Sequence, residues 1–288
     1  MNKKILILGS SGQIGSYLFE YLKRKNYSPI KFDIQRSKNE DLRTKNNLKL
    51  IKLIKKVDFV FFLAFDVGGA KYLHQFQNTT QFISNNLLIM ENTFQILKKF
   101  KVNFIFTSTQ MSNMTFSNYG LLKKVGEQYT KSINGLCVKL WNVYGIEKKH
   151  LKSHVITDFI TQGFTKKKVK LLTNGKEKRN FLHVEDCCDA LILLMERYKF
   201  FISREIIEVS SDSSISINKL SKIIKKLFLQ IDRRVSFVSG KKIDIVQNYY
   251  GNSPNKFLRK YWKPKLTLEL GIKKIFDYHR IFLFENGK

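Results

Sequence analysis

A tyrosine and a lysine four positions apart, preceded by two hydroxyl residues, form the part of the sequence best suited to proton transfer. Tyr119 and Lys123 fall in a helical pattern, where this spacing puts both side chains on one face. A cation held near a phenol favours the phenolate, so we expect Lys123 to lower the pKa of Tyr119. Ser108 and Thr109 follow a strand-like apolar run and supply hydroxyls for a substrate oxygen. Such a pair is also common on solvated helices, so the surrounding elements decide its meaning.

A strand, a glycine-rich turn and a helix open the chain. Residues 4–8 read KILIL, a run suited to a buried strand, and an amphipathic segment begins after the glycines. Glycine lets a backbone turn tightly and approach a diphosphate, and the N-terminus of the next helix presents free N–H groups to it. This order predicts a dinucleotide site at the turn, formed by Gly9, Ser11, Gly12, Gln13, Ile14 and Gly15.

An aspartate closes the next predicted strand, residues 29–33, at the distance where dinucleotide sites place an acidic group on the adenosine ribose. A carboxylate repels a 2′-phosphate, so Asp33 favours NAD over NADP, while the nearby Arg36 weakens that preference. Asp41 and Leu42 are candidates for an adenine contact, and the alternative for Asp41 is an ordinary exposed loop position.

Apolar runs alternate with helical patterns along most of the chain. Strands are expected at residues 57–64, 102–106 and 206–209, and helices at 48–56, 77–100, 117–133 and 187–198. This alternation predicts an α/β fold with a Rossmann-type doubly wound parallel sheet. Later patterns predict a smaller, interleaved C-terminal lobe, with helices at 154–164, 216–229 and 266–282 and strands at 169–172 and 234–238. We expect residues 1–150 and 181–209 to form the dinucleotide domain, and residues 151–180 and 210–288 the substrate lobe.

Composition argues against several classes of protein. Only five apolar residues precede Gly9, and no apolar run approaches the roughly 20 residues of a membrane span, so a cytoplasmic protein without membrane contact is expected. Cys137, Cys187 and Cys188 offer neither a disulfide framework nor the spacing of metal ligands, so no metal is expected. The net charge of +29 raises the question of a nucleic-acid partner. The lysines are dispersed, however, which argues against nucleic acid and suits a phosphorylated substrate.

The order of the motifs resembles that of the extended short-chain dehydrogenases/reductases, and among them the NAD-dependent nucleotide-sugar epimerases and dehydratases. The resemblance covers nearly the whole chain. It is carried by Gly9, Gly12, Gly15, Asp33, Leu63, Ala64, Asn86, Ser108, Thr109, Tyr119, Lys123 and the segments 140–145 (LWNVYG), 179–186 (RNFLHVED) and 261–265 (YWKPK).

The resemblance implies NAD as cofactor and a nucleotide sugar as substrate, acted on at a sugar carbon, which we expect to be C4. By this resemblance Tyr119 is the catalytic acid and base, and Lys123 holds the nicotinamide ribose. Thr109 bonds the reacting sugar oxygen, with Ser108 as its substitute. The implied setting is the synthesis of surface-glycan precursors.

Further roles follow from the same resemblance. Leu63 and Ala64 would lie against the cofactor, and Asn142 and Arg179 would bind the nucleotide diphosphate, since a guanidinium matches phosphate through two parallel hydrogen bonds. The helices at 77–100 and 117–133 correspond to those that form a homodimer interface in many members, so a homodimer is expected.

Two departures from the family pattern narrow the activity. Gln110 and Met111 stand where 4,6-dehydratases carry an Asp-Glu pair, and neither can act as an acid or base. We therefore expect an epimerase or a 4-dehydrogenase or ketoreductase, between which the sequence does not choose. Tyr119 follows Thr109 by only ten positions, so the sugar site is expected to be open, to take an unusual sugar, or to be completed by another chain. A non-catalytic NAD-binding protein of the same fold, with RNA or a protein as partner, is the alternative that the charge suggests.

Overall fold

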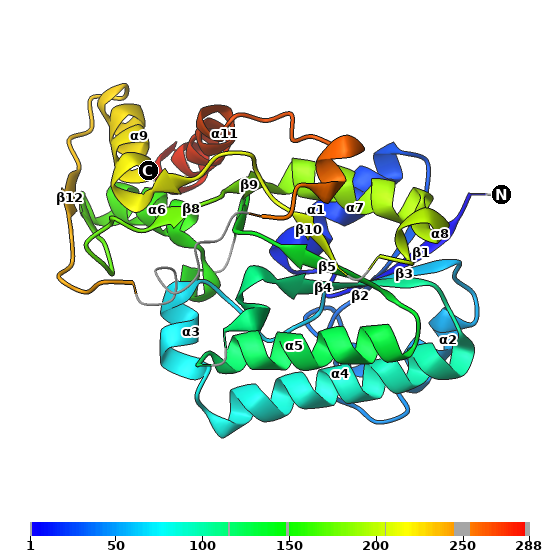
Figure 1. Cartoon of the computed structure of the whole chain (residues 1–288). Helices are drawn as coiled ribbons and strands as arrows, with labels where there is room; N and C mark the ends of the chain where they lie inside the picture. The colour runs from blue at the N-terminus through cyan, green and yellow to red at the C-terminus, as the bar shows by residue number, and fades with distance from the viewer. Residues whose placement is uncertain (1, 115, 148–149, 205, 245–253, 286–288) are drawn as a thin grey trace.

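A six-stranded parallel sheet occupies the middle of the molecule, and helices cover both of its faces (Figure 1). The computed structural model describes residues 2–114, 116–147, 150–204, 206–244 and 254–285. The sheet is formed by β1 (Lys4–Leu8), β2 (Ser28–Phe32), β3 (Phe59–Phe62), β4 (Phe104–Thr109), β5 (Leu136–Leu140) and β10 (Ile207–Val209). All neighbouring pairs are parallel, which confirms the expected α/β, doubly wound fold.

The strand order, β10-β5-β4-β3-β1-β2, contains one reversal of direction, at β1. The chain leaves β1 for β2 at the edge of the sheet and then returns to β3 on the other side of β1. Open parallel sheets bind ligands in the crevice that such a reversal creates at the carboxyl ends of the strands. Because β1, β3 and β4 are neighbours, the glycine turn, Leu63 and Thr109 all meet at this edge.

Each face of the sheet has its own apolar core. Helices α1 (Gln13–Arg24) and α7 (Val184–Glu196), with α8 (Tyr198–Phe201), cover one face, and α2 (Leu48–Ile54), α4 (Thr80–Phe100) and α5 (Asn118–Ser132) cover the other (Figure 1). Alternate strand residues serve the two cores: Ile7 and Phe61 belong to the first, Leu8 and Phe62 to the second. Burial on both faces explains why these strands read as unbroken apolar runs.

Side-chain caps set the helix boundaries that differ from those predicted. The amide of Phe82 donates to Thr79 Oγ1 (3.2 Å), so α4 begins at Thr80 rather than at residue 77. A separate helix, α3 (Ala70–Phe76), lies just before it and was not predicted. The strand β5 was also not among the strands predicted.

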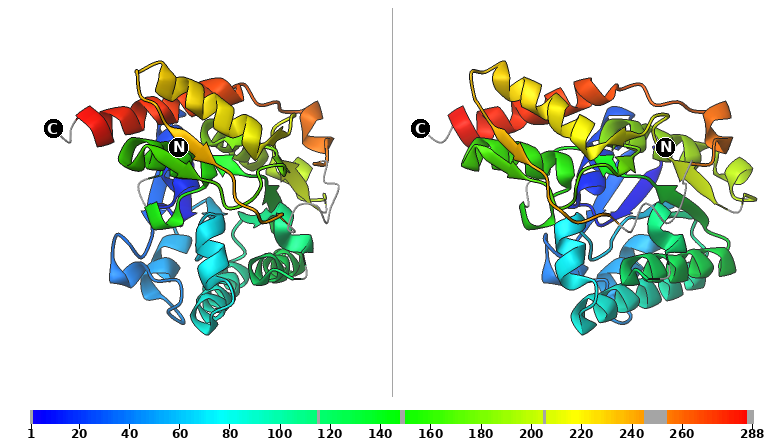
Figure 2. Two further views of the ribbon diagram at one scale, coloured as in Figure 1. Left: turned by 90° about the vertical axis from the view of Figure 1, so that its left-hand side faces the viewer. Right: turned by 60° about the vertical axis from the view of Figure 1, so that its left-hand side comes forward.

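A second group of elements contains its own apolar cluster, centred on Phe164, Phe228 and Phe276. Its helices are α6 (Val155–Lys166), α9 (Ile217–Leu229) and α11 (Leu268–Arg280), and Figure 2 shows them on the side of the molecule opposite α4 and α5. Its strands form short pairs: β6 (Val143–Tyr144) with β9 (Leu182–His183), β8 (Lys178–Arg179) with β11 (Ile215–Ser216), and β7 (Lys168–Lys170) with β12 (Ser236–Val238). The predicted domain boundaries stay a prediction.

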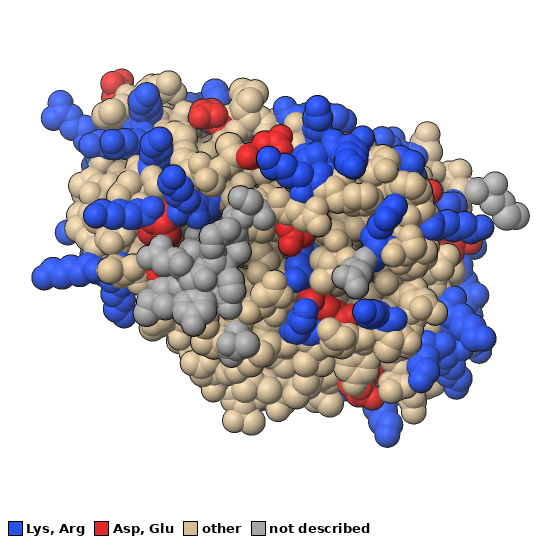
Figure 3. Space-filling model, viewed as in Figure 1, with Lys and Arg blue, Asp and Glu red and all other residues tan. Residues whose placement is uncertain are grey.

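The described residues also contain five short helical turns: η1 (Lys38–Glu40), η2 (Gln110–Asn113), η3 (His150–Lys152), η4 (Phe257–Lys260) and η5 (Ile281–Glu285). Among the described residues, no helix combines the length and the apolar character that crossing a membrane requires. Lysine and arginine side chains are spread over the face shown in Figure 3, in keeping with the dispersed charge of the sequence.

Candidate active site

The predicted proton-transfer residues are brought together at the end of β4. Ser117 caps α5 by accepting a hydrogen bond from the amide of Gly120 (3.2 Å), and this fixes the start of the helix that carries Tyr119 and Lys123. Thr109 ends β4, and its side chain lies close enough to the Tyr119 phenol to oppose the rise in the pKa of Tyr119. A substrate oxygen placed at this pair would therefore meet both hydroxyls at once.

Lys123 does not act on Tyr119 in the way the sequence predicted. Its ammonium donates to the carbonyl oxygen of Thr107 (2.7 Å) and lies 3.9 Å from the centre of the Phe65 ring. Burial lowers the pKa of Lys123 to about 7. Burial also raises the pKa of Tyr119 to about 12, and the nearby Thr109 side chain opposes that rise. The predicted lowering of the Tyr119 pKa by Lys123 is thus absent from this arrangement, because the ammonium points to the carbonyl and the ring instead.

Ser108 lines the cavity, but its hydroxyl is engaged with a neighbouring side chain, so its predicted role as a substitute for Thr109 stays a prediction. Side chains alternate along a strand, and Ser108 faces α5 while Thr109 faces the substrate side. The Ser108 hydroxyl donates to the buried carboxylate of Glu127 (2.6 Å). The ammonium groups of Lys139 and Lys124 lie 3.4 Å and 3.2 Å from the oxygens of the same carboxylate. These two lysines therefore compensate the negative charge of Glu127. Ser108 therefore belongs to a buried polar network beneath the site.

The glycine turn has the geometry that close approach to a diphosphate requires. Gly9 has a φ of 88°, and a Cβ there would lie 2.7 Å from the Ala64 nitrogen, so only glycine fits between β1 and β3. Helix α1 begins at Gln13 with no side-chain cap, so its first N–H groups face the cavity. The predicted turn residues, Gly9, Ser11, Gly12, Gln13, Ile14 and Gly15, all line that cavity.

Asp33 is held in place at the end of β2. Its carboxylate accepts hydrogen bonds from the amides of Ser11 and Gln35, both at 2.9 Å. Its own amide donates to the buried Glu40 carboxylate (2.7 Å), which adds a second negative charge beside the predicted ribose site. Arg36 donates to the Lys31 carbonyl oxygen (2.9 Å). The preference for NAD over NADP that Asp33 indicates stays a prediction.

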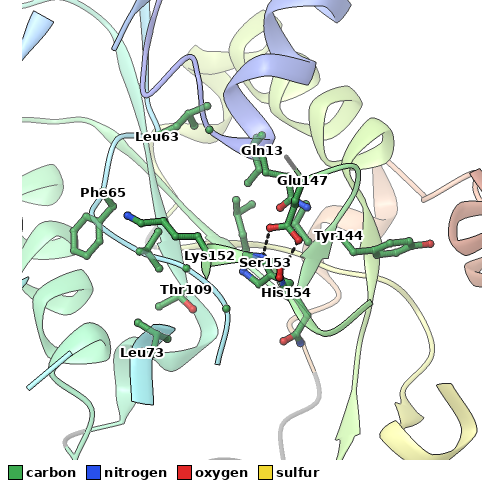
Figure 4. Close-up of a pocket in the computed structure, with 18 of the residues that line it drawn as sticks. Gln13, Leu63, Phe65, Leu73, Thr109, Tyr144, Glu147, Lys152, Ser153 and His154 are labelled. Atoms are coloured by element: carbon green, nitrogen blue, oxygen red, sulfur yellow. Dashed lines mark hydrogen bonds and ion pairs between the residues drawn. The ribbon is translucent and has the colours of Figure 1, made fainter. Parts of the chain in front are cut away.

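The remaining predicted cofactor residues also line the cavity, with different degrees of exposure. The Arg43 guanidinium donates hydrogen bonds to both carboxylate oxygens of Asp41. These bonds lower the pKa of the Asp41 carboxyl, although partial burial opposes that shift. Leu42 is almost fully buried in the core under α4, so only its edge is available to an adenine. Leu63 and Ala64 follow β3 directly, and Figure 4 shows Leu63 at the upper end of the cavity.

The two predicted diphosphate residues lie farther along the same cavity. Asn142 donates to the Asn180 carbonyl oxygen (3.3 Å), which ties the end of β5 to the segment that carries Arg179. Arg179 forms an ion pair with Asp244. Burial lowers the pKa of Arg179, and the carboxylates of Asp244 and Glu177 oppose that shift. The Nη1 atom of Arg179 is buried without a hydrogen-bond partner in the described structure. An anionic ligand in the cavity could accept a hydrogen bond from this atom.

A single cavity joins all of these positions, from the glycine turn to Arg179. Its volume is about 2030 Å³. A site for one small ligand is typically about 300–1,000 Å³, so this cavity has room for a dinucleotide and a second ligand together. In the described part of the chain, no group of three or more His, Cys, Asp or Glu side chains is arranged to hold a metal ion.

The wall expected from a longer loop between Thr109 and Tyr119 is supplied by α3 and the turn after it. Gln77 accepts a hydrogen bond from Ser117 Oγ (3.0 Å), and Asn118 donates to Asn78 Oδ1 (3.1 Å). These bonds tie the corner between α3 and α4 to the start of α5. Leu73, His74 and Gln77 then line the cavity, and Figure 4 shows Leu73 close to Thr109.

A histidine and a glutamate that the sequence did not single out also face the cavity (Figure 4). Glu147 accepts from the His154 amide (2.8 Å), and its other oxygen lies 2.6 Å from His154 Nδ1. Burial alone would lower the pKa of His154, but the Glu147 carboxylate outweighs burial and raises it. The two residues lie seven positions apart in an irregular segment, so no periodic pattern in the sequence could have paired them.

Comparison with known proteins gives a consistent picture. A family model described as the NAD dependent epimerase/dehydratase family matches residues 5–210. The GDP-L-fucose synthase of Sinorhizobium fredii is 26% identical over 316 aligned positions, which cover 96% of this chain and 95% of the relative. A GDP-6-OMe-4-keto-L-xylo-heptose reductase from C. jejuni superposes with a TM-score of 0.83 at 19% identity and 98% coverage of both chains. A GDP-D-glycero-L-gluco-heptose synthase from Campylobacter jejuni, solved in the presence of NADPH, gives 0.78 at 20% identity, covering 97% of this chain and 98% of the other.

Proposed function

The chain belongs to the NAD-dependent epimerase/dehydratase family, and on that premise we propose that it transfers a hydride at C4 of a nucleotide sugar, as an epimerase or as a 4-dehydrogenase or ketoreductase. The observation that carries the proposal is the Thr109–Tyr119 hydroxyl pair beside Lys123, at the edge of the sheet where the cofactor cavity opens. The three relatives described above are named for GDP-linked sugars, so a GDP-sugar is the first substrate to test.

The residues of this chain would handle the proton that accompanies the hydride. The nicotinamide of NAD(P) supplies or accepts the hydride itself. In reduction the phenol of Tyr119 gives its proton to the carbonyl oxygen, which Thr109 holds by a hydrogen bond, and a hydroxyl results. In oxidation the same proton returns from the hydroxyl to the phenolate. Lys123 would contact the nicotinamide ribose, and the α1 N-terminus and Asp33 would bind the diphosphate and the adenosine ribose.

The protonation state of Tyr119 suits the reductive step of the proposed reaction. Burial raises the pKa of Tyr119 to about 12, so the group is a phenol at neutral pH and is ready to donate a proton. Oxidation would first require its ionisation. Gln110 and Met111 begin the turn η2 next to Thr109, where they supply no acid or base for a 4,6-dehydration. A nucleotide-linked product of this kind would enter the synthesis of surface glycans.

A panel of GDP-, UDP-, CDP- and dTDP-linked 4-keto sugars and hexoses, incubated with the purified protein and NAD(H) or NADP(H), tests the proposal. We expect stoichiometric oxidation of NADH with a 4-keto substrate. Interconversion of two hexoses without net change in NADH would identify an epimerase instead. Net formation of NADH from NAD with a hexose would identify a 4-dehydrogenase. Absence of all three reactions across the panel, with cofactor bound, would contradict the proposal.

A second candidate activity is suggested by the Glu147–His154 pair. An imidazole whose pKa is raised by a carboxylate can exchange a proton with carbon next to a ketone, which would invert C3 or C5 of a 4-keto sugar. In that case His154→Gln would abolish incorporation of solvent deuterium into the sugar and leave reduction by NADH in place. Retention of exchange in this variant would exclude the assignment.

We further propose that the chain forms a homodimer through α4 and α5. Four large apolar side chains on these helices are exposed, which are Leu87, Leu88, Leu121 and Val125. Burial of such a patch is a common basis for self-association. Leu88→Lys should shift the protein toward a monomer in analytical ultracentrifugation, and an unchanged sedimentation coefficient would contradict this interface.

A further inference from the structure

Two irregular segments from opposite sides of the cleft meet at one end of the cavity. The first follows β3 and contains Asp66 and Gly69, and the second is η3 with Lys152 and the residues after it. The Gly69 amide donates to the Lys152 carbonyl oxygen (2.9 Å). A Cβ at Gly69 would lie 2.2 Å from the Ser153 oxygen, so the contact depends on glycine. The two backbones are therefore in direct contact beside the sugar end of the cavity.

A charged pair spans the same contact. Lys152 Nζ lies 2.8 Å from Asp66 Oδ1, and the Tyr72 hydroxyl donates to the same oxygen (2.7 Å). Asn85 donates to the other carboxylate oxygen (3.1 Å), and the Lys152 ammonium also lies 4.4 Å from the centre of the Tyr72 ring. The Asp66 side chain is 19% exposed, so this pair is partly removed from water and is stronger than an ordinary surface ion pair.

Asp66 is a rigid anchor for this pair. The fully buried Asn86 accepts from the Asp66 amide (2.7 Å) and donates to the Asp66 carbonyl oxygen (3.1 Å). The backbone on both sides of the carboxylate is thus fixed to α4. The ion pair between Lys152 and Asp66 therefore links η3 to α4, which packs on the sheet.

The segment held in this way carries His154. Lys152 is two residues before His154, whose amide and ring both bond to Glu147. Because Nδ1 faces Glu147, Nε2 is the ring nitrogen left for a ligand in the cavity. Figure 4 shows Lys152 reaching toward the side of Phe65, while His154 and Glu147 face the middle of the cavity. The position of the imidazole therefore depends on where Lys152 is held.

We propose that Asp66 and Lys152 form a clasp across the cleft and act as positioning residues, which hold His154 in register with the sugar bound at Thr109 and Tyr119. The inference rests on the proposed function for the identity of the sugar site. It adds residues that touch neither the cofactor turn nor the hydroxyl pair. Small displacements of reacting groups, of about 1 Å, can reduce rates about 100-fold, so such a clasp has a measurable effect.

The chain offers a matched control. Lys265 pairs with Asp189 on α7 (3.3 Å), and neither residue is among those that line the cavity. Its lysine is 74% exposed, compared with 36% for Lys152, and the pair belongs to neither of the two segments that meet beside the cavity. Lys265→Met therefore makes the same change of charge and length as Lys152→Met without releasing η3.

The first test is kinetic. Lys152→Met and Asp66→Asn should each lower the rate of solvent-deuterium incorporation into the sugar about 10- to 100-fold, with the Kd for NADH unchanged. The double variant should be no slower than the slower single variant, because both changes break one contact. Lys152→Arg should restore most of the exchange rate, and Lys265→Met should remain within about two-fold of the native protein. An unchanged exchange rate in Lys152→Met, or an equal loss in Lys265→Met, would overturn the proposal.

The second test does not depend on activity. The pKa of His154, assigned by comparison with His154→Gln, can be followed by NMR titration of the imidazole signals. In Lys152→Met the raised pKa of His154 should fall toward the ordinary histidine value, because the released segment loosens the contact with Glu147, whereas Lys265→Met should leave it unchanged. If Lys152→Met keeps the native His154 titration, the clasp does not position His154. If the titration shifts as expected but no sugar reacts, the clasp stands and the proposed function fails.

Discussion

The cofactor side and the sugar side of the cleft are built in different ways. The cofactor side consists of strand ends of one parallel sheet, where β1, β3 and β4 deliver the glycine turn, Leu63 and Thr109 to a common edge. The sugar side consists of α3, η3 and short strand pairs, held by side-chain contacts such as that between Lys152 and Asp66. The first arrangement is fixed by the sheet, and the second depends on individual side chains. Substitutions on the two sides should therefore have different consequences.

The largest expected effect is at the hydroxyl pair. Tyr119→Phe removes the proton donor and keeps the ring, so kcat should fall by about 10²- to 10⁴-fold while the Kd for NADH stays within about two-fold. Stopped-flow oxidation of NADH and fluorescence titration measure the two quantities. Native activity in Tyr119→Phe would support the non-catalytic alternative, and an RNA affinity that falls steeply with salt would then identify its partner.

The cofactor side can be tested at Asp33. Hydrogen bonds to a charged group contribute about 1.5–3 kcal/mol, so Asp33→Asn should weaken NADH binding about 10- to 150-fold and narrow its advantage over NADPH. The control is Asp58→Asn. Asp58 lies at the amino end of β3, away from the carboxyl ends of the strands, so this variant should bind both cofactors as the native protein does. Equal losses for NADH and NADPH in Asp33→Asn would contradict the assignment of Asp33 to the ribose.

Neighbouring hydroxyls on β4 should separate stability from activity. Ser108→Ala leaves the buried Glu127 without one donor, so the free energy of unfolding should fall by about 1–3 kcal/mol, with kcat reduced by only a few-fold. Thr109→Val should lower kcat strongly and change the free energy of unfolding little, since it removes the hydroxyl beside the Tyr119 phenol. Urea denaturation and steady-state kinetics on both variants provide the comparison. A loss of kcat in Ser108→Ala as large as that in Thr109→Val would restore Ser108 to the site.

The smallest expected effect concerns Lys123 in the cofactor-free protein. Burial lowers its pKa from 10.5 to about 7, so between those values the unfolded chain binds a proton that the folded chain has released. Stability from this group therefore rises as pH increases from about 7 toward 10, with a slope of at most ~1.4 kcal/mol per pH unit. Lys123→Met should flatten the pH dependence of the unfolding free energy between pH 7 and about pH 9. Equal slopes in the two proteins would mean that Lys123 stays charged.

The sequence was sufficient where residue type and strand order determine position. Gly9 and Asp33 could be placed because a parallel sheet with a reversal at β1 leaves few options for the residues that follow its strands. Tyr119 could be linked to Thr109 because a short turn joins the strand to a capped helix. These relationships are local, or they are imposed by the sheet.

Other features depend on contacts that no local pattern encodes. The direction of the Lys123 ammonium depends on the Phe65 ring and the Thr107 carbonyl oxygen, which only the folded structure brings near it. The commitment of Ser108 to Glu127 joins positions nineteen residues apart. The pairing of Asp66 with Lys152 joins residues eighty-six positions apart in two irregular segments. Spacing in the sequence gives no signal for contacts of this kind.

Transfer of deuterium from NADH to the sugar shows directly whether this protein reduces C4. The protein would be incubated with a GDP-linked 4-keto sugar and NADH that carries deuterium at the transferable position, and the product would be examined by NMR and mass spectrometry. We predict one deuterium at C4 of the product sugar, and none when Tyr119→Phe replaces the native protein over the same time. Deuterium at another carbon, or no transfer by the native protein with both ligands bound, would contradict this prediction.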